Sequence, residues 1–255
     1  MTNLAIAKRI IGPVQNYLGR YLDRTARVYA AEARRYAAGR EFSADDLSWS
    51  PLKTTSARAV KRAIDIAGGL IGAAALVPTT IILAPVIRFF SPGPLLFFHV
   101  REGLNECPFK LPKFRTMNEN MQVGGHDGPD KTQPLEWAQI TGRRVTGAGR
   151  YMRALAIDEL PQCVLLLNGK LTMMGPRALS KVDLDRHEDP RYNWREVRKK
   201  FTPALGPAAF CLSGAFSSRE EIELMEIYYF GNWTLWLDIK LLGRGLLAIA
   251  AGRHY

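Results

Sequence analysis

The feature that most constrains the fold is an uncharged run of 22 residues, Ile66 to Ile87, which reads IAGGLIGAAALVPTTIILAPVI. A helix of this length is long enough to cross a bilayer, which needs about 20 apolar residues. Pro78 lies near the centre of the run and Pro85 near its end, and each removes a backbone hydrogen-bond donor. The run therefore predicts a membrane helix that is broken at Pro78.

Basic residues flank this run on both sides: Arg58, Lys61 and Arg62 precede it, and Arg88 and Arg101 follow it. Because positive residues are retained on the cytoplasmic face, both ends are expected on the same side. A helix–break–helix that enters one leaflet and returns satisfies both features, with Asp65 at the headgroup boundary and the break buried against protein. A helix that spans the bilayer and a buried core helix are the alternatives.

The chain of 255 residues is basic, with a formal net charge of +11, and the excess is unevenly distributed. Residues 1–62 hold twelve Lys and Arg against five Asp and Glu, which is +7 and leaves +4 for the other 193 residues. A nucleic-acid-binding protein usually carries its excess on the recognition domain, among aromatic residues. Here the excess precedes an apolar run, which favours membrane lipids as the partner and argues against nucleic acid.

The three cysteines, Cys107, Cys163 and Cys211, are far apart and form no CxxC motif. This spacing argues for a reducing compartment and against a zinc site. The N-terminus shows no signal-peptide segment followed by a cleavage site. The length suits one core domain with appendages.

Residues 1–56 predict a basic amphipathic helix followed by a linker. Over residues 3–38, apolar residues recur at helical spacing among arginines: Ile10, Val14, Tyr17 or Leu18, and Tyr21 or Leu22. Such a helix, with a kink expected at Pro13, either packs on its own domain or lies in a membrane interface. Residues 41–56 are polar and are interpreted as the linker.

Beyond residues 57–90, which hold the membrane helix, residues 91–255 predict a cytosolic domain. Strands are expected over 95–100 and 109–117, with a turn over 101–105, a lid-like excursion over 118–140 and an irregular stretch over 202–218. Charged surface helix is expected over 181–200 and further helix over 219–229, and the apolar stretch 235–251 either packs on the core or lies along the membrane. The expected fold class is mostly helical α+β with amphipathic interfacial helices.

An acidic pair, Asp158-Glu159, lies between two groups of basic residues. Arg143, Arg144, Arg150 and Arg153 precede the pair, and Lys170 and Gly175-Pro176-Arg177 follow it. Asp158 is expected to cap a helix that has Pro161 in its first turn and ends at Asn168-Gly169. Two carboxylates at a helix N-terminus suit a phosphate, a metal or an ionised nucleophile. A capped helix with a solvated first turn explains the same residues.

An ordered set of motifs extends over about residues 61–255. It comprises Lys61-Arg62-Ala63-Ile64-Asp65 with the apolar run, Ser91-Pro92-Gly93-Pro94, Lys113-Phe114-Arg115-Thr116-Met117, Arg144-Val145-Thr146, Asp158-Glu159-Leu160-Pro161-Gln162, Gly175-Pro176-Arg177, Tyr228-Tyr229 with Trp233, and Leu237-Asp238-Ile239-Lys240. Each motif alone is weak, but in this order the set resembles the bacterial sugar transferase family. These proteins are monotopic polyprenyl-phosphate phosphoglycosyl transferases.

The resemblance implies transfer of a sugar-1-phosphate from a UDP-sugar to polyprenol (undecaprenyl) phosphate, with Mg²⁺, at the cytoplasmic face of the bacterial inner membrane. Asp158 would be the nucleophile that attacks the sugar-proximal phosphorus and releases UMP, and a Mg²⁺ ligand, with Glu159 as its partner in proton or metal handling. The residues that would contact phosphate or substrate are Arg153, Arg177, Lys113, Arg115 and Gln162, although salt bridges within the fold explain Lys113 and Arg115 as well.

Three departures from the family pattern bear on function. Val77-Pro78 replaces a Ser-Pro break, Lys170 replaces an acid, and residues 202–207 replace an Arg-Pro-Gly-Ile-Thr-Gly block. These changes keep a second function open, a catalytically weak or inactive membrane-bound scaffold. The sequence leaves open which sugar is transferred and whether the chain forms a homo-oligomer. Residues 118–140 and 202–218 are expected to select the sugar.

Overall fold

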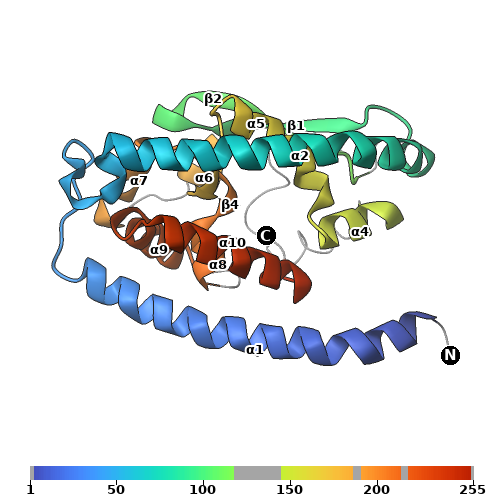
Figure 1. The fold of residues 1–255 in the computed structure, drawn as a ribbon, viewed down its shortest axis with the longest axis horizontal. Coiled ribbons are helices and arrows are strands. Elements are labelled where there is room, and N and C mark those ends of the chain that lie inside the picture. The colour runs from blue at the N-terminus through green and yellow to red at the C-terminus, as the bar shows by residue number, and fades with distance from the viewer. Residues whose placement is uncertain (1–2, 118–144, 186–190, 214–217, 254–255) are drawn as a thin grey trace.

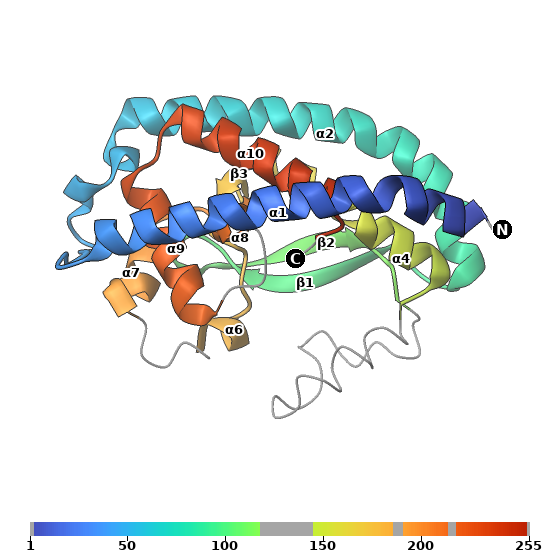
Figure 2. The same cartoon turned by 90° about the horizontal axis from the view of Figure 1, so that it is seen from below.

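The computed structural model describes residues 3–117, 145–185, 191–213 and 218–253. They form a mostly helical molecule with two small two-stranded sheets, in agreement with the expected α+β class. Three long helices run beside one another: α1 (Asn3–Ala37), α2 (Thr55–Phe90) and α10 (Leu235–Ala250). In both Figure 1 and Figure 2, α10 lies between α2 and α1.

The long N-terminal helix is confirmed, and Pro13 lies inside it. Leu22 and Ala33 are fully buried against the domain, and Ala30 and Ala37 nearly so. The small alanine side chains allow the backbone of α1 to lie close to α8 (Ala208–Ser213) and α9 (Arg219–Gly231), which it contacts. Packing on its own domain therefore accounts for one side of α1.

Residues 41–56, interpreted as a linker from the sequence, pack against the domain. It contains two short 3₁₀ helices, η1 (Leu47–Trp49) and η2 (Pro51–Lys53). Phe42 and Leu52 are buried, and the buried Ser50 hydroxyl donates to the Phe230 carbonyl at 2.5 Å. The polar composition of this segment suggested a linker. Composition alone does not show that a few apolar residues pack against the domain.

The apolar run lies in α2, which is one uninterrupted helix with Pro78 and Pro85 inside it. The expected break at Pro78 is therefore wrong at the level of secondary structure. Each proline removes one donor, and the neighbouring turns remain helical. Figure 2 shows that the C-terminal end of α2 curves back toward the rest of the molecule.

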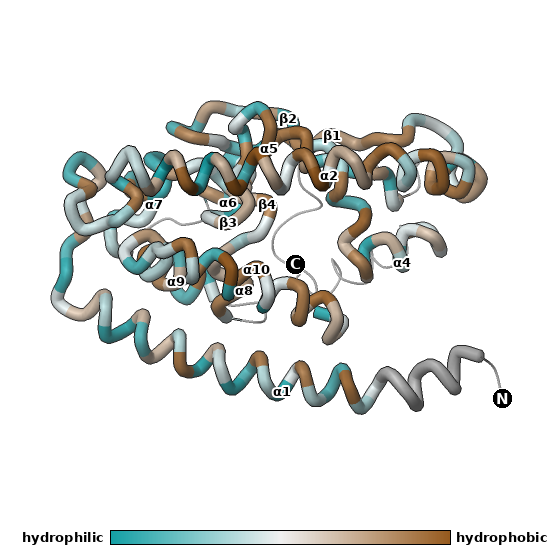
Figure 3. The backbone as a smooth tube through the Cα atoms, viewed as in Figure 1, coloured by the Kyte–Doolittle hydropathy of each residue, from teal (hydrophilic) through white to brown (hydrophobic). Residues whose placement is uncertain are grey.

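Among the described residues, α2 is the one helix long and apolar enough to cross a membrane, and only 11% of its most apolar window is buried. Figure 3 shows the apolar character concentrated in the C-terminal half of the helix. A buried core helix is therefore excluded for this segment, since most of its apolar surface has no protein partner. The re-entrant path stays a prediction.

The two strands expected after α2 are confirmed with shifted ends. β1 (Leu96–Glu102) and β2 (Pro108–Phe114) form an antiparallel hairpin in which Leu96 faces Phe114. The turn falls later than expected, because the strand continues through Glu102 and the 3₁₀ helix η3 (Leu104–Glu106) forms the tip.

The second sheet was not expected. β3 (Thr172–Gly175) pairs in parallel with β4 (Ala204–Pro207), and α8 follows directly. The prediction that residues 202–218 are irregular is therefore wrong for residues 204–213. These strands have four residues each and contain Gly and Pro, so pairing between distant segments determines them rather than local pattern.

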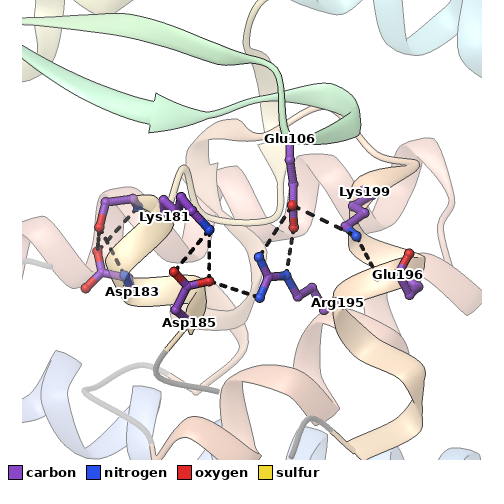
Figure 4. Close-up of polar contacts among 8 residues, drawn as sticks. Glu106, Lys181, Asp183, Asp185, Arg195, Glu196 and Lys199 are labelled. Carbon is purple, nitrogen blue, oxygen red and sulfur yellow. Dashed lines mark hydrogen bonds and ion pairs between the residues drawn. The ribbon is translucent and has the colours of Figure 1, made fainter. Parts of the chain in front are cut away.

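The helices expected near the C-terminus are confirmed: α9 ends two residues later than expected and α10 one residue earlier. The described residues within 181–200 include the short helices α6 (Lys181–Asp185) and α7 (Trp194–Lys199), with the 3₁₀ helix η6 (Arg191–Asn193) before α7. Arg195 pairs with Asp185 and with Glu106 of η3, as Figure 4 shows. The surface character is confirmed only in part, because Trp194 and Val197 are fully buried.

The remaining short helices surround the acidic pair. They are α4 (Gly147–Ala154), the 3₁₀ helix η5 (Ile157–Gln162) and α5 (Cys163–Leu167). The main hydrophobic core joins α1, α7, α8, α9 and α10, while a second cluster lies between β2 and α5. The acidic pair lies beside a third cluster, formed by Ile87 of α2, Phe114 of β2 and Met152 of α4.

Candidate functional site

The acidic pair lies in the first turn of η5, which continues into α5. Asp158 does not cap the helix, so that expectation is wrong: the N-cap residue is Ala156, in the left-handed region at φ 53°, without a side-chain cap. Backbone N–H groups at a helix N-terminus favour anions over the first turn as well as at the cap, so the pair keeps its electrostatic setting. The helix ends at Asn168-Gly169 as expected.

The two carboxylates of the pair differ in their partners. Lys113 on β2 forms an ion pair with Glu159, so the hairpin holds this side chain in place. Asp158 is buried, with 7% exposed, and among the described residues its carboxylate accepts no side-chain hydrogen bond. Burial raises the pKa of Asp158, and the nearby Lys113 charge opposes this shift. Asp158 is thus the carboxylate left available for a ligand.

Arg153 approaches the pair from α4. Its Nε donates to the Thr116 hydroxyl at 2.9 Å, and its largely buried guanidinium lies within the field of Asp158 and Glu159. Burial lowers the pKa of Arg153, while the two carboxylates raise it. The position of α4 is tightly set, because a Cβ on Gly149 would lie 2.3 Å from the Thr116 carbonyl oxygen. The structure therefore brings Asp158, Glu159, Lys113 and Arg153 together.

His99 on β1 belongs to the same neighbourhood and was missed in the sequence. Burial lowers its pKa to about 4, with further lowering from Arg101, Lys113 and Arg153. His99 is therefore neutral at pH 7. Its uncharged imidazole lies among cationic side chains and can form hydrogen bonds. A single histidine inside an apolar strand was the only available signal.

Three other candidate residues have different surroundings. Arg115 is buried and donates to the Ser91 carbonyl, so it ties the loop after α2 to β2. Gln162 is 3% exposed, and its Nε2 has no hydrogen-bond partner among the described residues. Arg177 is exposed, and its backbone N–H donates to Glu226 at 3.0 Å. Arg143, Arg144 and the excursion 118–140 lie outside the described residues.

The basic residues at the head of α2 fasten this helix to the domain. Lys61 Nζ donates to the Met174 carbonyl at 2.6 Å and pairs with Asp238 Oδ2 at 3.0 Å. The Arg62 guanidinium donates to the last carbonyls of α5, those of Leu166 and Leu167. The Lys61-Arg62 motif thus sets where α2 lies relative to the helix that follows the acidic pair.

Asp65 is likewise structural. It is buried, and its Oδ1 accepts from the Thr172 hydroxyl at 2.8 Å and from the Met173 N–H at 2.7 Å. These contacts are within the protein, and the expectation that Asp65 lies at a headgroup boundary stays a prediction. Its partners on β3 are more than a hundred residues away in the chain, so no local pattern reveals them.

A cavity of about 560 Å³ lies between the packed linker, the head of α2 and β3. Its lining includes Lys53, Arg58 and Lys200 but none of the four residues gathered around Asp158. The cavity is therefore separate from the acidic pair.

The acidic pair can be tested for fit to Mg²⁺. Among the described residues no group of three or more His, Cys, Asp or Glu is close enough to hold a metal ion. Mg²⁺, however, commonly uses one or two carboxylates together with substrate phosphates and water. The free Asp158 carboxylate, with Glu159 beside it, fits that shared mode and does not fit an all-protein cage.

The departures from the family pattern fall on structural positions. Lys170 is exposed in the turn between α5 and β3, where its backbone N–H donates to Asn168 Oδ1 at 3.1 Å. Residues 204–207 of the altered block form β4, so this block still completes the parallel sheet. These departures therefore do not replace Asp158, Glu159, Lys113 or Arg153.

The chain is similar to known proteins over most of its length. Residues 56–252 match the family model described as bacterial sugar transferase. The UDP-glucose:undecaprenyl-phosphate glucose-1-phosphate transferase of Caulobacter vibrioides is 35% identical over 202 residues, which cover 76% of this chain and 71% of that protein. A UDP-N-acetylgalactosamine-undecaprenyl-phosphate N-acetylgalactosaminephosphotransferase of Aeromonas hydrophila is 29% identical, over 76% of this chain and 44% of that protein.

Proposed function

Because the chain belongs to the bacterial sugar transferase family, we propose that it transfers a sugar-1-phosphate from a UDP-sugar to undecaprenyl phosphate. The relatives are named as phosphotransferases, and the chain is a transferase of this family. The donor and acceptor classes come from the printed names of those relatives. Such a transfer is the first step in assembling a surface polysaccharide or glycoconjugate.

One observation carries the proposed mechanism: of two adjacent carboxylates at a helix start, Glu159 is bound by Lys113, whereas Asp158 accepts from no side chain among the described residues. An Asp158 oxygen attacks the sugar-proximal phosphorus, and the bond from that phosphorus to the bridging oxygen of UMP breaks. An oxygen of the polyprenol phosphate then attacks the same phosphorus and releases Asp158. The covalent route divides one transfer between two bulky substrates into two displacements at one site.

The surrounding cations lower the cost of bringing a carboxylate to a polyanion. Arg153 offers a planar fork suited to phosphate oxygens, and Lys113 places a second positive charge beside the pair. The N–H groups at the start of η5 add further positive potential. Gln162, with a buried unpartnered Nε2, is a candidate donor to a phosphate or sugar oxygen. We assign no direct phosphate contact to Arg115.

Magnesium is the proposed cofactor, and Asp158 and Glu159 are the residues that would hold it. When bound, it neutralises charge on the diphosphate and on the departing UMP. Lys113 orients Glu159 for this task through their ion pair.

The long apolar helix and the family both support membrane association. We propose that α2 enters the cytoplasmic leaflet of the inner membrane and that its curved C-terminal half returns the chain to the cytoplasmic face. Positive residues at both ends of the apolar run support this path. Hairpin β1–β2 and α4 then hold the acidic pair beside α2, near the depth of a polyprenol headgroup.

The test is a nucleotide-release assay in nanodiscs with undecaprenyl phosphate, Mg²⁺ and a panel of UDP-sugars. The proposal expects UMP release with at least one donor, and expects Asp158→Asn to abolish it while Lys200→Gln, beside the separate cavity, does not. Full activity of Asp158→Asn would refute the role of Asp158. Absence of release with every donor, together with a stable protein partner in pull-downs, would instead support the scaffold function.

A further inference from the structure

Helix α1 carries an exposed apolar stripe that the transferase reaction does not use. Val14, Tyr17, Tyr21 and Val28 are 57%, 65%, 47% and 54% exposed, and their spacing places them in one line along the helix. The stripe lies on a different side of α1 from Leu22 and Ala33, which are buried against the domain. Figure 3 shows apolar and polar turns alternating along this helix.

Arginines border the stripe, whereas the acidic residues of α1 are occupied by the domain. Arg20, Arg24, Arg34 and Arg35 are exposed, and none of them forms an ion pair with another described residue. Asp23 pairs with Arg253 at 2.6 Å, and Glu32 accepts a hydrogen bond from the Tyr228 hydroxyl at 2.9 Å. The outward surface of α1 is therefore both aromatic and cationic.

The orientation of α1 is fixed by contacts near its middle and its end. Arg244 of α10 donates to the Thr25 hydroxyl and to the Cys211 carbonyl, so one buried guanidinium joins α1, α8 and α10. The stripe therefore has a defined direction relative to the other long helices. Helix α10, which lies between α1 and α2 in Figures 1 and 2, carries its own exposed apolar residues: Leu235, Trp236, Ile239 and Leu246.

We propose that α1 is a membrane-surface helix that binds the headgroup region of an anionic bilayer. Tyr17 and Tyr21 enter the interface, where an amphipathic ring has its apolar body in lipid and its hydroxyl in water. The bordering arginines contact lipid phosphates. The inference does not rest on the chemistry of Asp158, and the family model, which begins at residue 56, does not include α1.

Charge favours lipid over a second copy of the chain as the occupant of this surface. Two α1 helices packed through their stripes would bring their unpaired arginines together, and like charges at close range oppose association. An anionic lipid surface offers phosphates to the same arginines. Neighbouring α10 also exposes apolar residues, so a bilayer can contact both helices at once.

The test uses the full chain in nanodiscs and two labelling positions one residue apart. In a Cys107→Ser background, Tyr17→Cys and Asn16→Cys place a fluorescent label on the stripe and about 100° away from it around the helix. Both positions are exposed, while the other two cysteines, Cys163 and Cys211, are buried. Thermal unfolding of each variant reports whether the label disturbs the fold.

In nanodiscs containing anionic brominated lipids, the label at position 17 should lose most of its emission, and the label at position 16 should keep it. Replacing both Arg20 and Arg24 by Gln should restore emission at position 17 when half of the lipid is anionic, and high salt should do the same. Equal quenching at both positions, or none at position 17, would overturn the inference. Cross-linking between copies through position 17 would assign the stripe to a second copy instead.

UMP release measured in detergent separates this inference from the proposed function. The Arg20/Arg24 double variant should release UMP at the unaltered rate there, because neither residue contacts the group around Asp158. Loss of quenching with intact UMP release would refute only the role of α1. Intact quenching with no UMP release from the unaltered chain would refute only the transferase proposal.

Discussion

Asp158 and Asp238 are both buried carboxylates, 7% and 2% exposed, but their surroundings are opposite. Asp238, on α10, accepts from Lys61 Nζ at 3.0 Å, from the Tyr229 hydroxyl at 2.7 Å and from the Trp233 indole N–H at 3.0 Å. Asp158 accepts from no side chain among the described residues, although Lys113 and Arg153 lie near it.

The difference separates a carboxylate that holds the fold together from one that is available for chemistry. Donors from three elements satisfy Asp238, so removing it would leave a buried ammonium without its partner. Asp158 is instead kept at a cost, because burial raises its pKa, against the lowering by Lys113, Arg153 and its own backbone N–H. A buried ionisable group with a raised pKa next to cations is a signature of a reactive site.

The largest expected effect is on activity. Asp158→Asn should lower the rate of UMP release by at least about a thousandfold, because an amide oxygen cannot replace a carboxylate nucleophile. The same variant should be no less stable than the unaltered chain at pH 7. The sign follows from the raised pKa: the stability contributed by Asp158 is present at low pH and is lost as the pH rises through its folded pKa. Release assays and thermal unfolding in detergent measure the two quantities.

Asp238→Ala should show the reverse pattern. Removing one partner of a buried ion pair typically costs about 3–5 kcal/mol, because Lys61 would lose its carboxylate. The free energy of unfolding should fall by that order, while activity per folded molecule should change little. Asp185→Ala, which removes surface ion pairs with Lys181 and Arg195, is the matched control and should have little effect. Equal destabilisation by both variants would contradict the contrast between buried and surface pairs.

His99 should produce a pH-dependent loss of stability. Its pKa is about 4 in the folded chain and 6.5 in the unfolded chain, so below pH 6.5 the unfolded chain binds a proton that the folded chain does not. Stability should therefore fall by about 2–3 kcal/mol as the pH falls from 6.5 to 4. Comparing unfolding curves with those of His99→Gln isolates this contribution. A His99→Gln variant with the same pH dependence as the unaltered chain would rule it out.

Gly72 should be the least tolerant of the helical glycines in α2. A Cβ at this position would lie 2.2 Å from Cys163 Sγ, so Gly72→Ala would push α2 away from α5. The expected loss of stability is about 1–3 kcal/mol, which is typical of overpacking. Gly243→Ala in α10, with nothing within 4 Å of its Cβ, should instead stabilise by up to about 1 kcal/mol. Chemical unfolding of both variants in detergent measures this difference.

Much of this fold follows from local pattern. The spacing of Val14, Leu18 and Leu22 predicted α1, and the uncharged run predicted α2, because a long repeat of apolar residues is a strong helical signal. The hairpin β1–β2 was located to within a few residues. The parallel sheet β3–β4 was not predicted, since its register depends on segments about thirty residues apart.

The candidate site likewise combines residues that local sequence pattern identified with residues that come together only in the fold. The acidic pair was identified from its position in the chain. Its partners Lys113 on β2 and Arg153 on α4 come together with it only in the fold. The resemblance to the sugar transferase family had already suggested both partners. His99 was missed, and the hydrogen bonds of Asp65 to β3 were not predicted, because the surroundings of both residues come from distant elements. The expected Pro78 break was wrong, since a proline removes one hydrogen bond and the rest of α2 sustains the helix.

The most direct test of the central claim is to trap the covalent intermediate. The chain in nanodiscs is incubated with Mg²⁺ and an active UDP-sugar without acceptor, quenched in acid, digested and analysed by mass spectrometry. If Asp158 is the nucleophile, we expect a sugar-phosphate adduct on Asp158 that disappears when undecaprenyl phosphate is added. We expect no adduct in Asp158→Asn. An adduct on Glu159, or full transfer by a chain in which no adduct forms, would contradict the role of Asp158 as the covalent nucleophile.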